Sequence, residues 1–153
     1  MHIATNSEKI DISLEVKTAE LAKNFSKILK KGDIVLLQGE IGVGKTTFIR
    51  HLINSFQLNN AKSVTEVTSP TFNLVNEYDV GIFTIQHYDL YRLKSSEETK
   101  NIGLLENSKE KLTLIEWPEK IEKKIENRID LLFEYKEDMS KRLLSINGIS
   151  NEK

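Results

Sequence analysis

The chain has 153 residues, of which 39% are hydrophobic and 29% charged, and this balance predicts one packed domain rather than a disordered chain. The formal net charge is −1, without the basic surplus of a protein that binds nucleic acid by itself. Cysteine is absent, which excludes disulfides and thiolate metal sites. The N-terminus lacks the apolar core of a signal peptide, and no apolar stretch approaches the ~20 residues of a membrane span. We therefore expect a soluble, cytoplasmic protein without a membrane partner.

The first predicted elements are a strand, a helix and a second strand. Apolar and polar residues alternate over 10–16, which predicts a half-buried strand. The apolar spacing over 18–30 predicts a helix, with Thr18 as its N-cap and Gly32 just beyond its end. A short apolar run at 34–37 then predicts a buried parallel strand. This strand leads directly into the most informative stretch of the chain.

That stretch fits the pattern G-x-x-x-x-G-K-[ST], with Gly39, Gly44, Lys45 and Thr46 at the defining positions. Glycine lets the backbone N–H groups of such a loop fold around phosphate oxygens, and the following helix points its N-terminus at the same oxygens. The lysine of the pattern contacts the β- and γ-phosphates, and the next hydroxyl binds Mg²⁺. Apolar residues after the loop recur with the helical period. The order of strand, glycine loop and helix therefore predicts a nucleoside triphosphate site.

The elements after the loop are predicted from their apolar spacing and turn residues. They are, in chain order, a hairpin of strands over 72–78 and 82–90, a short helix over 95–101, a buried strand over 112–115, a helix over 118–128 and a closing hairpin of strands over 129–135 and 142–146. Parallel strands around the glycine loop and two antiparallel hairpins predict an α/β fold, a single P-loop NTPase-like domain with a mixed sheet flanked by helices. We place this ATPase domain at 1–146 and a flexible C-terminal tail at 147–153.

Two acidic residues follow predicted strands and are candidates for the carboxylate that a phosphate-loop enzyme needs to hold Mg²⁺. Glu116 ends an apolar strand and Asp89 ends a less apolar one, and the residues alone leave open which is the direct ligand. His87 shares a face with Asp89 and is interpreted as structural, since no second histidine or cysteine lies near it to make a zinc site. Trp117 is expected either in the core or against the nucleotide.

Four motifs occur in a fixed order along the chain. They are Gly39-Glu40-Ile41-Gly42-Val43-Gly44-Lys45-Thr46-Thr47, Ser69-Pro70-Thr71-Phe72, His87-Tyr88-Asp89-Leu90-Tyr91-Arg92-Leu93 and Ile115-Glu116-Trp117-Pro118-Glu119. In this order they resemble the TsaE (YjeE) family, the small bacterial ATPases of tRNA threonylcarbamoyladenosine synthesis. The glycine loop is shared by many families, whereas the other three motifs in this order are specific. The resemblance covers nearly the whole chain, from the helix at Thr18 to the last hairpin.

The resemblance implies a role for each candidate residue. Lys45, Asp89 and Glu116 would carry the chemistry. Thr46 and Glu116 would bind Mg²⁺, with Asp89 as a second acidic position that acts through water. The residues expected to contact ATP are Thr18, Gly39, Glu40, Ile41, Gly42, Val43, Gly44, Lys45, Thr46, Thr47, Ser69, Thr71, Trp117 and Arg142. Of these, Ser69 and Thr71 belong to a switch-like segment that faces the γ-phosphate.

The implied function is an ATPase, with ATP and Mg²⁺ as cofactors, that supports the TsaD–TsaB complex in forming N6-threonylcarbamoyladenosine in tRNA. The low net charge agrees with an indirect contact to tRNA through these partners. Hydrolysis by the chain alone is expected to be weak and partner-stimulated, because neither Arg50 nor Arg92 is placed as an arginine finger. One departure concerns partner contacts: the family commonly has consecutive acids after a Gly-hydrophobic pair, whereas 103–106 keeps only Glu106.

The residues leave two alternative functions open. A small-molecule kinase usually needs several cations and a lid, and this chain has few arginines and no long insertion. A nucleotide-dependent switch or assembly factor that uses GTP would need a guanine-reading N-K-x-D stretch, which the sequence lacks.

Overall fold

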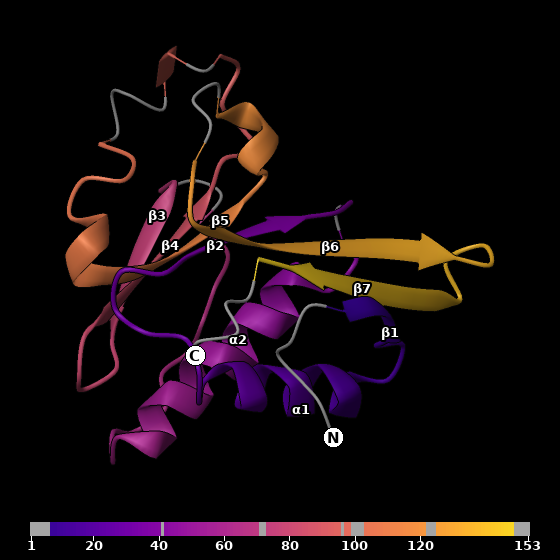
Figure 1. Cartoon of the computed structure of the whole chain (residues 1–153), viewed down its shortest axis with the longest axis horizontal. Helices are drawn as coiled ribbons and strands as arrows, with labels where there is room; N and C mark the ends of the chain where they lie inside the picture. Colours follow the sequence, from indigo (N-terminus) through magenta and orange to yellow (C-terminus); the bar gives the residue numbers. More distant parts are fainter. Residues whose placement is uncertain are drawn as a thin grey trace.

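The computed structural model describes residues 7–40, 42–70, 73–95, 97–98, 103–121 and 125–148, which form one seven-stranded sheet with two α-helices against one face (Figure 1). The helices and strands are β1 (Ser7–Asp11), α1 (Glu15–Phe25), β2 (Ile34–Gln38), α2 (Lys45–Asn59), β3 (Val75–Asp79), β4 (Thr84–Asp89), β5 (Lys111–Glu116), β6 (Arg128–Lys136) and β7 (Lys141–Asn147). Short 3₁₀ helices lie at Ser108–Glu110 and Pro118–Lys120. The mixed sheet with flanking helices confirms the predicted fold class.

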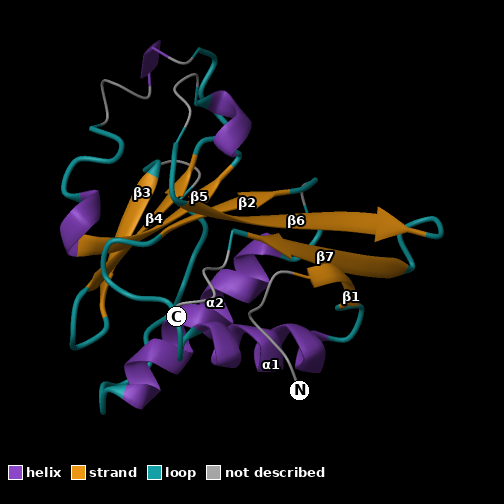
Figure 2. Cartoon of the chain, viewed as in Figure 1, coloured by secondary structure: helices purple, strands orange, loops and turns teal. Residues whose placement is uncertain are grey.

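The strand order is β1-β7-β6-β2-β5-β4-β3 (Figure 2). The four central strands β6, β2, β5 and β4 are parallel, whereas β3, β7 and β1 pair antiparallel toward the two edges. Leu37 of β2 pairs with Glu116 of β5, and Glu116 in turn pairs with Asp89 of β4. The carboxyl ends of these three strands therefore meet at one edge of the sheet, the edge where α/β sheets bind ligands.

The main core lies between the sheet and the two helices. Phe25 of α1 meets Phe48 of α2 edge-to-face with ring centres 5.6 Å apart, and Phe48 meets Phe133 of β6 at 6.0 Å. Each of the three side chains is at most 2% exposed, and full burial of such a side chain is worth about 1.5–3 kcal/mol. These contacts hold α2, and therefore the loop before it, in place over β6.

A smaller apolar cluster covers the other face of β2, β5 and β4. Leu36, Ile115 and Tyr88 contribute from the strands, and the segments that follow β4 and β5 contribute Leu93 and Ile125. The central strands are apolar on both faces because both faces are covered. Among the described residues, no helix is both long and apolar enough to cross a membrane.

The strand predicted over 10–16 is wrong, because β1 ends at Asp11 and α1 begins at Glu15. The Ser13 N–H donates to the Asp11 carboxylate at 2.9 Å, a local turn that ends the strand. The N-cap residue of α1 is Leu14, so Thr18 lies inside the helix, where it is buried, and the N-cap predicted at Thr18 is also wrong.

The helix predicted over 118–128 is also wrong. Of the described residues in that stretch, only Pro118–Lys120 are helical, Ile121 has an extended backbone, and Arg128 begins β6. Arg128 pairs with Ile34 of β2 and Asn127 before it has a φ of +52°, so the described end of the stretch enters the sheet through a turn instead of a helix. Residues 122–124 lie outside the described residues, as do most of the short helix predicted over 95–101 and of the tail predicted at 147–153.

Candidate active site

The loop between β2 and α2 owes its shape to three glycines with positive φ. The angles are +150° at Gly39, +81° at Gly42 and +114° at Gly44. A Cβ on Gly39 would lie 2.8 Å from the carbonyl oxygen of Phe133, so this position has no room for a side chain. Gly44 is the N-cap residue of α2, and the first backbone N–H groups of a helix have no acceptor within it. The loop and helix terminus therefore form an arrangement suited to phosphate.

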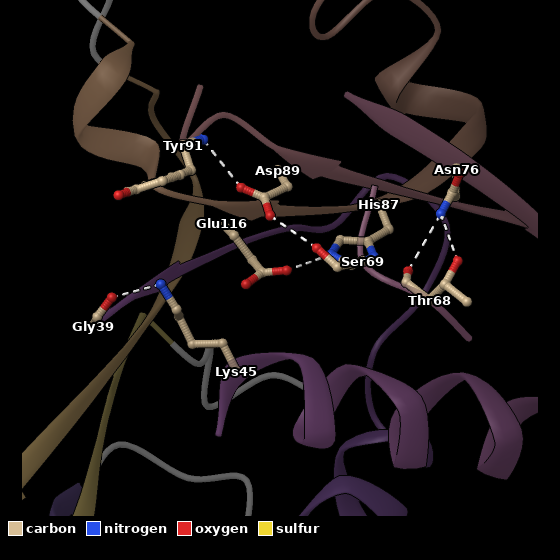
Figure 3. Close-up of polar contacts among 9 residues, drawn as sticks. All are labelled: Gly39, Lys45, Thr68, Ser69, Asn76, His87, Asp89, Tyr91 and Glu116. Atoms are coloured by element: carbon tan, nitrogen blue, oxygen red, sulfur yellow. Dashed lines mark hydrogen bonds and ion pairs between the residues drawn. The ribbon is translucent and has the colours of Figure 1, made fainter. Parts of the chain in front are cut away.

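Lys45 is buried at the first position of α2, with 4% of its surface exposed. Its Nζ donates to the Gly39 carbonyl at 2.5 Å, as Figure 3 shows, and lies 4.1 Å from the ring centre of Trp117. Burial lowers the pKa of Lys45, and the nearby carboxylates Glu116, Asp89 and Glu119 partly oppose that effect. A buried ammonium in this state gains stability when an anionic ligand approaches it.

Asp89 and Glu116 end the neighbouring parallel strands β4 and β5 and are 5% and 3% exposed. Their Cα atoms are partners in the sheet register, which places both carboxylates beside the loop. Asp89 accepts hydrogen bonds from the Ser69 hydroxyl at 3.1 Å and from the Tyr91 N–H at 3.0 Å (Figure 3). Two buried carboxylates side by side repel one another, so the pair is well suited to a bound cation.

Glu116 has a different partner, His87, which is two residues before Asp89 on β4. The two side chains meet with His87 Nε2 2.7 Å from Glu116 Oε2, and both are buried. The interpretation of His87 as a structural residue, drawn from the sequence, did not include this contact. Only the parallel register of β4 and β5 shows that His87 reaches the acidic end of the next strand.

A cavity of about 330 Å³ opens between these elements, within the size range of small-molecule sites. The residues that line it are Gly42, Gly44, Lys45, Thr46, Thr47, Ser69, Asp89, Tyr91, Glu116, Trp117 and Arg142. Arg142 reaches the cavity because β6 and β7 continue past the end of β2, where Gln38 pairs with Leu132. The backbone of Arg142 is held at this place by the Ser13 hydroxyl, which accepts its N–H at 3.0 Å.

Comparisons with known proteins agree on one family. The family model described as "Threonylcarbamoyl adenosine biosynthesis protein TsaE" matches residues 12–144. The chain belongs to the TsaE family. This membership confirms the resemblance seen in the motifs and assigns the chain to tRNA threonylcarbamoyladenosine biosynthesis.

Named relatives and a solved structure support the assignment. The chain is 45% identical over 143 residues to a tRNA threonylcarbamoyladenosine biosynthesis protein TsaE of Rickettsia felis, covering 90% of this chain and 78% of the relative. A Bacillus subtilis protein of the same name is 28% identical over 137 residues, covering 88% and 82%. The crystal structure of Bacillus subtilis YdiB superposes with a TM-score of 0.71 at 23% identity, covering 99% of this chain and 91% of that one, so the two chains share a fold.

The TsaE fold brings most of the predicted site residues together at the cavity, but not all of them. Thr18 is buried within α1, Val43 belongs to the main core, and Glu40 is exposed, and none of the three lines the cavity. Gly39 takes part through its carbonyl oxygen. Ile41 and Thr71 lie outside the described residues. Contact with ATP stays a prediction for every residue of the set.

Trp117 lies between the cavity and the smaller apolar cluster, and its contact with the nucleotide stays a prediction. It lines the cavity, and it also packs against the smaller apolar cluster. Tyr91 was not predicted as a site residue, yet it lines the cavity and its ring centre lies 4.9 Å from that of Trp117. The spacing of two residues along the predicted strand places Tyr91 on the same face as His87 and Asp89, and this was the signal in the sequence for a site residue.

The donors at the cavity suit Mg²⁺. Among the described residues, no group of three or more His, Cys, Asp or Glu side chains could hold a metal by itself. Mg²⁺ sites in nucleotide enzymes instead combine one or two carboxylates with substrate phosphates and water. The Thr46 hydroxyl and the carboxylates of Asp89 and Glu116 line the same cavity and are all hard oxygen ligands, so they fit this kind of ion.

Proposed function

We propose that the chain binds ATP with Mg²⁺ in this cavity and hydrolyses it in support of a TsaD–TsaB complex. The observation that carries the proposal is the in-register pair of Asp89 and Glu116, which line the same cavity as Lys45 and Thr46 of the glycine loop. A triphosphate site on this loop needs an acidic strand end opposite it, and the pair places two buried carboxylates there.

Each residue around the cavity has a role in the proposal. Lys45 exchanges the neutral Gly39 carbonyl for phosphate oxygens, because a charge-assisted hydrogen bond is stronger than a neutral one. Thr46, Glu116 and Asp89 would hold Mg²⁺, which when bound neutralises charge on the phosphate oxygens. The backbone N–H groups of the loop and of the start of α2 bind the phosphates.

Arg142 and Trp117 would bind further parts of the nucleotide. Arg142 comes from β7 and Trp117 from the end of β5, so they approach the cavity from opposite sides of β2. Arg142 would pair with an anionic or polar group of ATP. Trp117 offers a flat apolar surface next to the Lys45 amine.

Hydrolysis by the chain alone is expected to be slow. An arginine finger on the γ-phosphate is worth ~10³–10⁵ in kcat. Of the described residues that line the cavity, Arg142 is the one arginine, and the order of the sheet separates its strand from the carboxylates on β4 and β5. Arg50 is bound to Glu15 at 2.9 Å, on the side of α1. A partner is therefore the simpler source of the missing cation.

Calorimetry of ATP binding with and without Mg²⁺ tests the proposal. Lys45→Ala should abolish tight binding, whereas Lys23→Ala, on the exposed surface of α1, should leave it unchanged. Excess GTP should compete poorly with ATP. Unchanged ATP affinity in Lys45→Ala would refute the assignment of the loop.

Phosphate release then tests hydrolysis, first with the pure chain and next with TsaD and TsaB added. We expect turnover well below about 1 s⁻¹ for the chain alone, the lower end of self-sufficient phosphoryl-transfer enzymes. The partners should raise that rate. Rapid turnover by the chain alone would contradict completion by a partner, and phosphorylation of an added small-molecule acceptor would favour a kinase instead.

A further inference from the structure

His87 is a fully buried histidine whose two ring nitrogens have unequal surroundings. Nε2 lies 2.7 Å from Oε2 of Glu116. Nδ1 is buried and has no hydrogen-bond partner in the described part of the chain. A buried polar group of this kind needs an explanation, because nearly all such groups in proteins are paired.

The unequal surroundings favour one tautomer of the ring. A proton on Nδ1 would leave a buried N–H without an acceptor, and buried donors without a partner are rarer than buried acceptors without one. With the proton on Nε2, His87 donates to the Glu116 carboxylate and only an acceptor is left unpaired. The Nε2–H form therefore makes the one hydrogen bond that the geometry offers and avoids an orphaned donor.

The contact determines how the Glu116 carboxylate is presented. Figure 3 shows Oε2 turned toward His87 and the second carboxylate oxygen on the side of Lys45. A glutamate side chain has three rotatable bonds, and a hydrogen bond from a ring that is 0% exposed removes much of that freedom. Asp89 is held instead by Ser69 and by the backbone of Tyr91, after the end of β4.

We propose that His87 is a positioning residue for Glu116: as the Nε2–H tautomer it holds Oε2 and leaves the other carboxylate oxygen free to serve the cation of the site. The inference rests on the proposed function for that cation, but the hydrogen bond itself exists in the free chain. Outer partners of metal ligands typically change metal affinity by about 10–100-fold when they are removed.

The tautomer is measurable without any ligand. The chain has three histidines, so long-range ¹H–¹⁵N NMR spectra can be assigned by substituting each in turn. We expect His87 to show a protonated Nε2 and a bare Nδ1 in the free chain. A protonated Nδ1 would overturn the inference, whatever the chain proves to bind.

Binding experiments test the positioning role. His87→Leu should raise the Mg²⁺ concentration for half-maximal ATP binding by about 10–100-fold and change metal-free ATP binding by less than about 3-fold. His87→Gln, whose amide can still donate, should recover part of the loss. His51→Leu is the matched control, since His51 lies 2.8 Å from Glu15 in a surface His–Glu pair away from the cavity.

Each outcome has a separate meaning. If the parent chain shows no Mg²⁺-dependent ATP binding, the proposed function fails, and the tautomer still tests the hydrogen bond. If His87→Leu keeps the parental Mg²⁺ dependence, the positioning role is refuted. Equal weakening of metal-free and Mg²⁺-dependent binding, with a lower melting temperature, would also refute it, because that is the result of a purely structural role.

Discussion

Replacing Gly39 by alanine tests whether the glycine loop is as tightly fitted as its geometry indicates. A Cβ at this position would lie 2.8 Å from the Phe133 carbonyl oxygen and 2.9 Å from Val43 Cγ1, in a backbone with φ of +150°. The strained backbone costs about 1–3 kcal/mol and the overpacking about 1–3 kcal/mol more. We therefore expect Gly39→Ala to lower the free energy of unfolding by about 2–6 kcal/mol.

Gly44→Ala is the matched control in the same loop. Its φ is +114°, but no atom lies within 4 Å of the added Cβ, so only the backbone strain of about 1–3 kcal/mol applies. Urea denaturation of both variants isolates the steric contribution as the difference between them, and each kcal/mol should also lower Tm by about 2–4 °C. If Gly39→Ala is no less stable than Gly44→Ala, the close contact between Gly39 and β6 does not contribute to the stability of the folded chain.

Three further predictions concern the residues of the cavity. Lys45→Met should lose ATP binding without losing stability at neutral pH. Burial lowers the pKa of Lys45 in the folded chain below its ordinary 10.5, so the unfolded chain holds that proton more tightly. In urea titrations the free energy of unfolding of the parent should therefore rise relative to that of Lys45→Met as the pH rises toward 10.5. Thr46→Ala and Glu116→Ala should weaken Mg²⁺-dependent ATP binding more than metal-free binding by calorimetry; if Asp89→Ala does so and Glu116→Ala does not, the two acids have exchanged roles. Trp117 is the only tryptophan, so its emission should change when ATP and Mg²⁺ are added, and a flat titration at saturating ATP would show that its ring does not sense the nucleotide.

The wrong predictions have a common physical cause. The stretch 118–128 has helical spacing and a proline suited to a first turn, but parallel pairing with Ile34 makes Arg128 the first residue of a strand. The alternation over 10–16 was cut short by an Asp11 side chain that bonds the backbone of Ser13. In both places a specific hydrogen-bonding contact decided the conformation, and the periodicity of apolar residues does not encode such contacts.

The sequence by itself determined the glycine loop, the strand before it, the helix after it and the acidic ends of two later strands. These features are local, since each depends on residues that are neighbours along the chain. Only the tertiary structure aligned Asp89 with Glu116 and gave Glu116 its partner His87, and it showed that β7 brings Arg142 to the cavity, which the family resemblance had only implied. Strand order and register are choices among long-range pairings, and side chains far apart in the sequence become neighbours only once those pairings have formed.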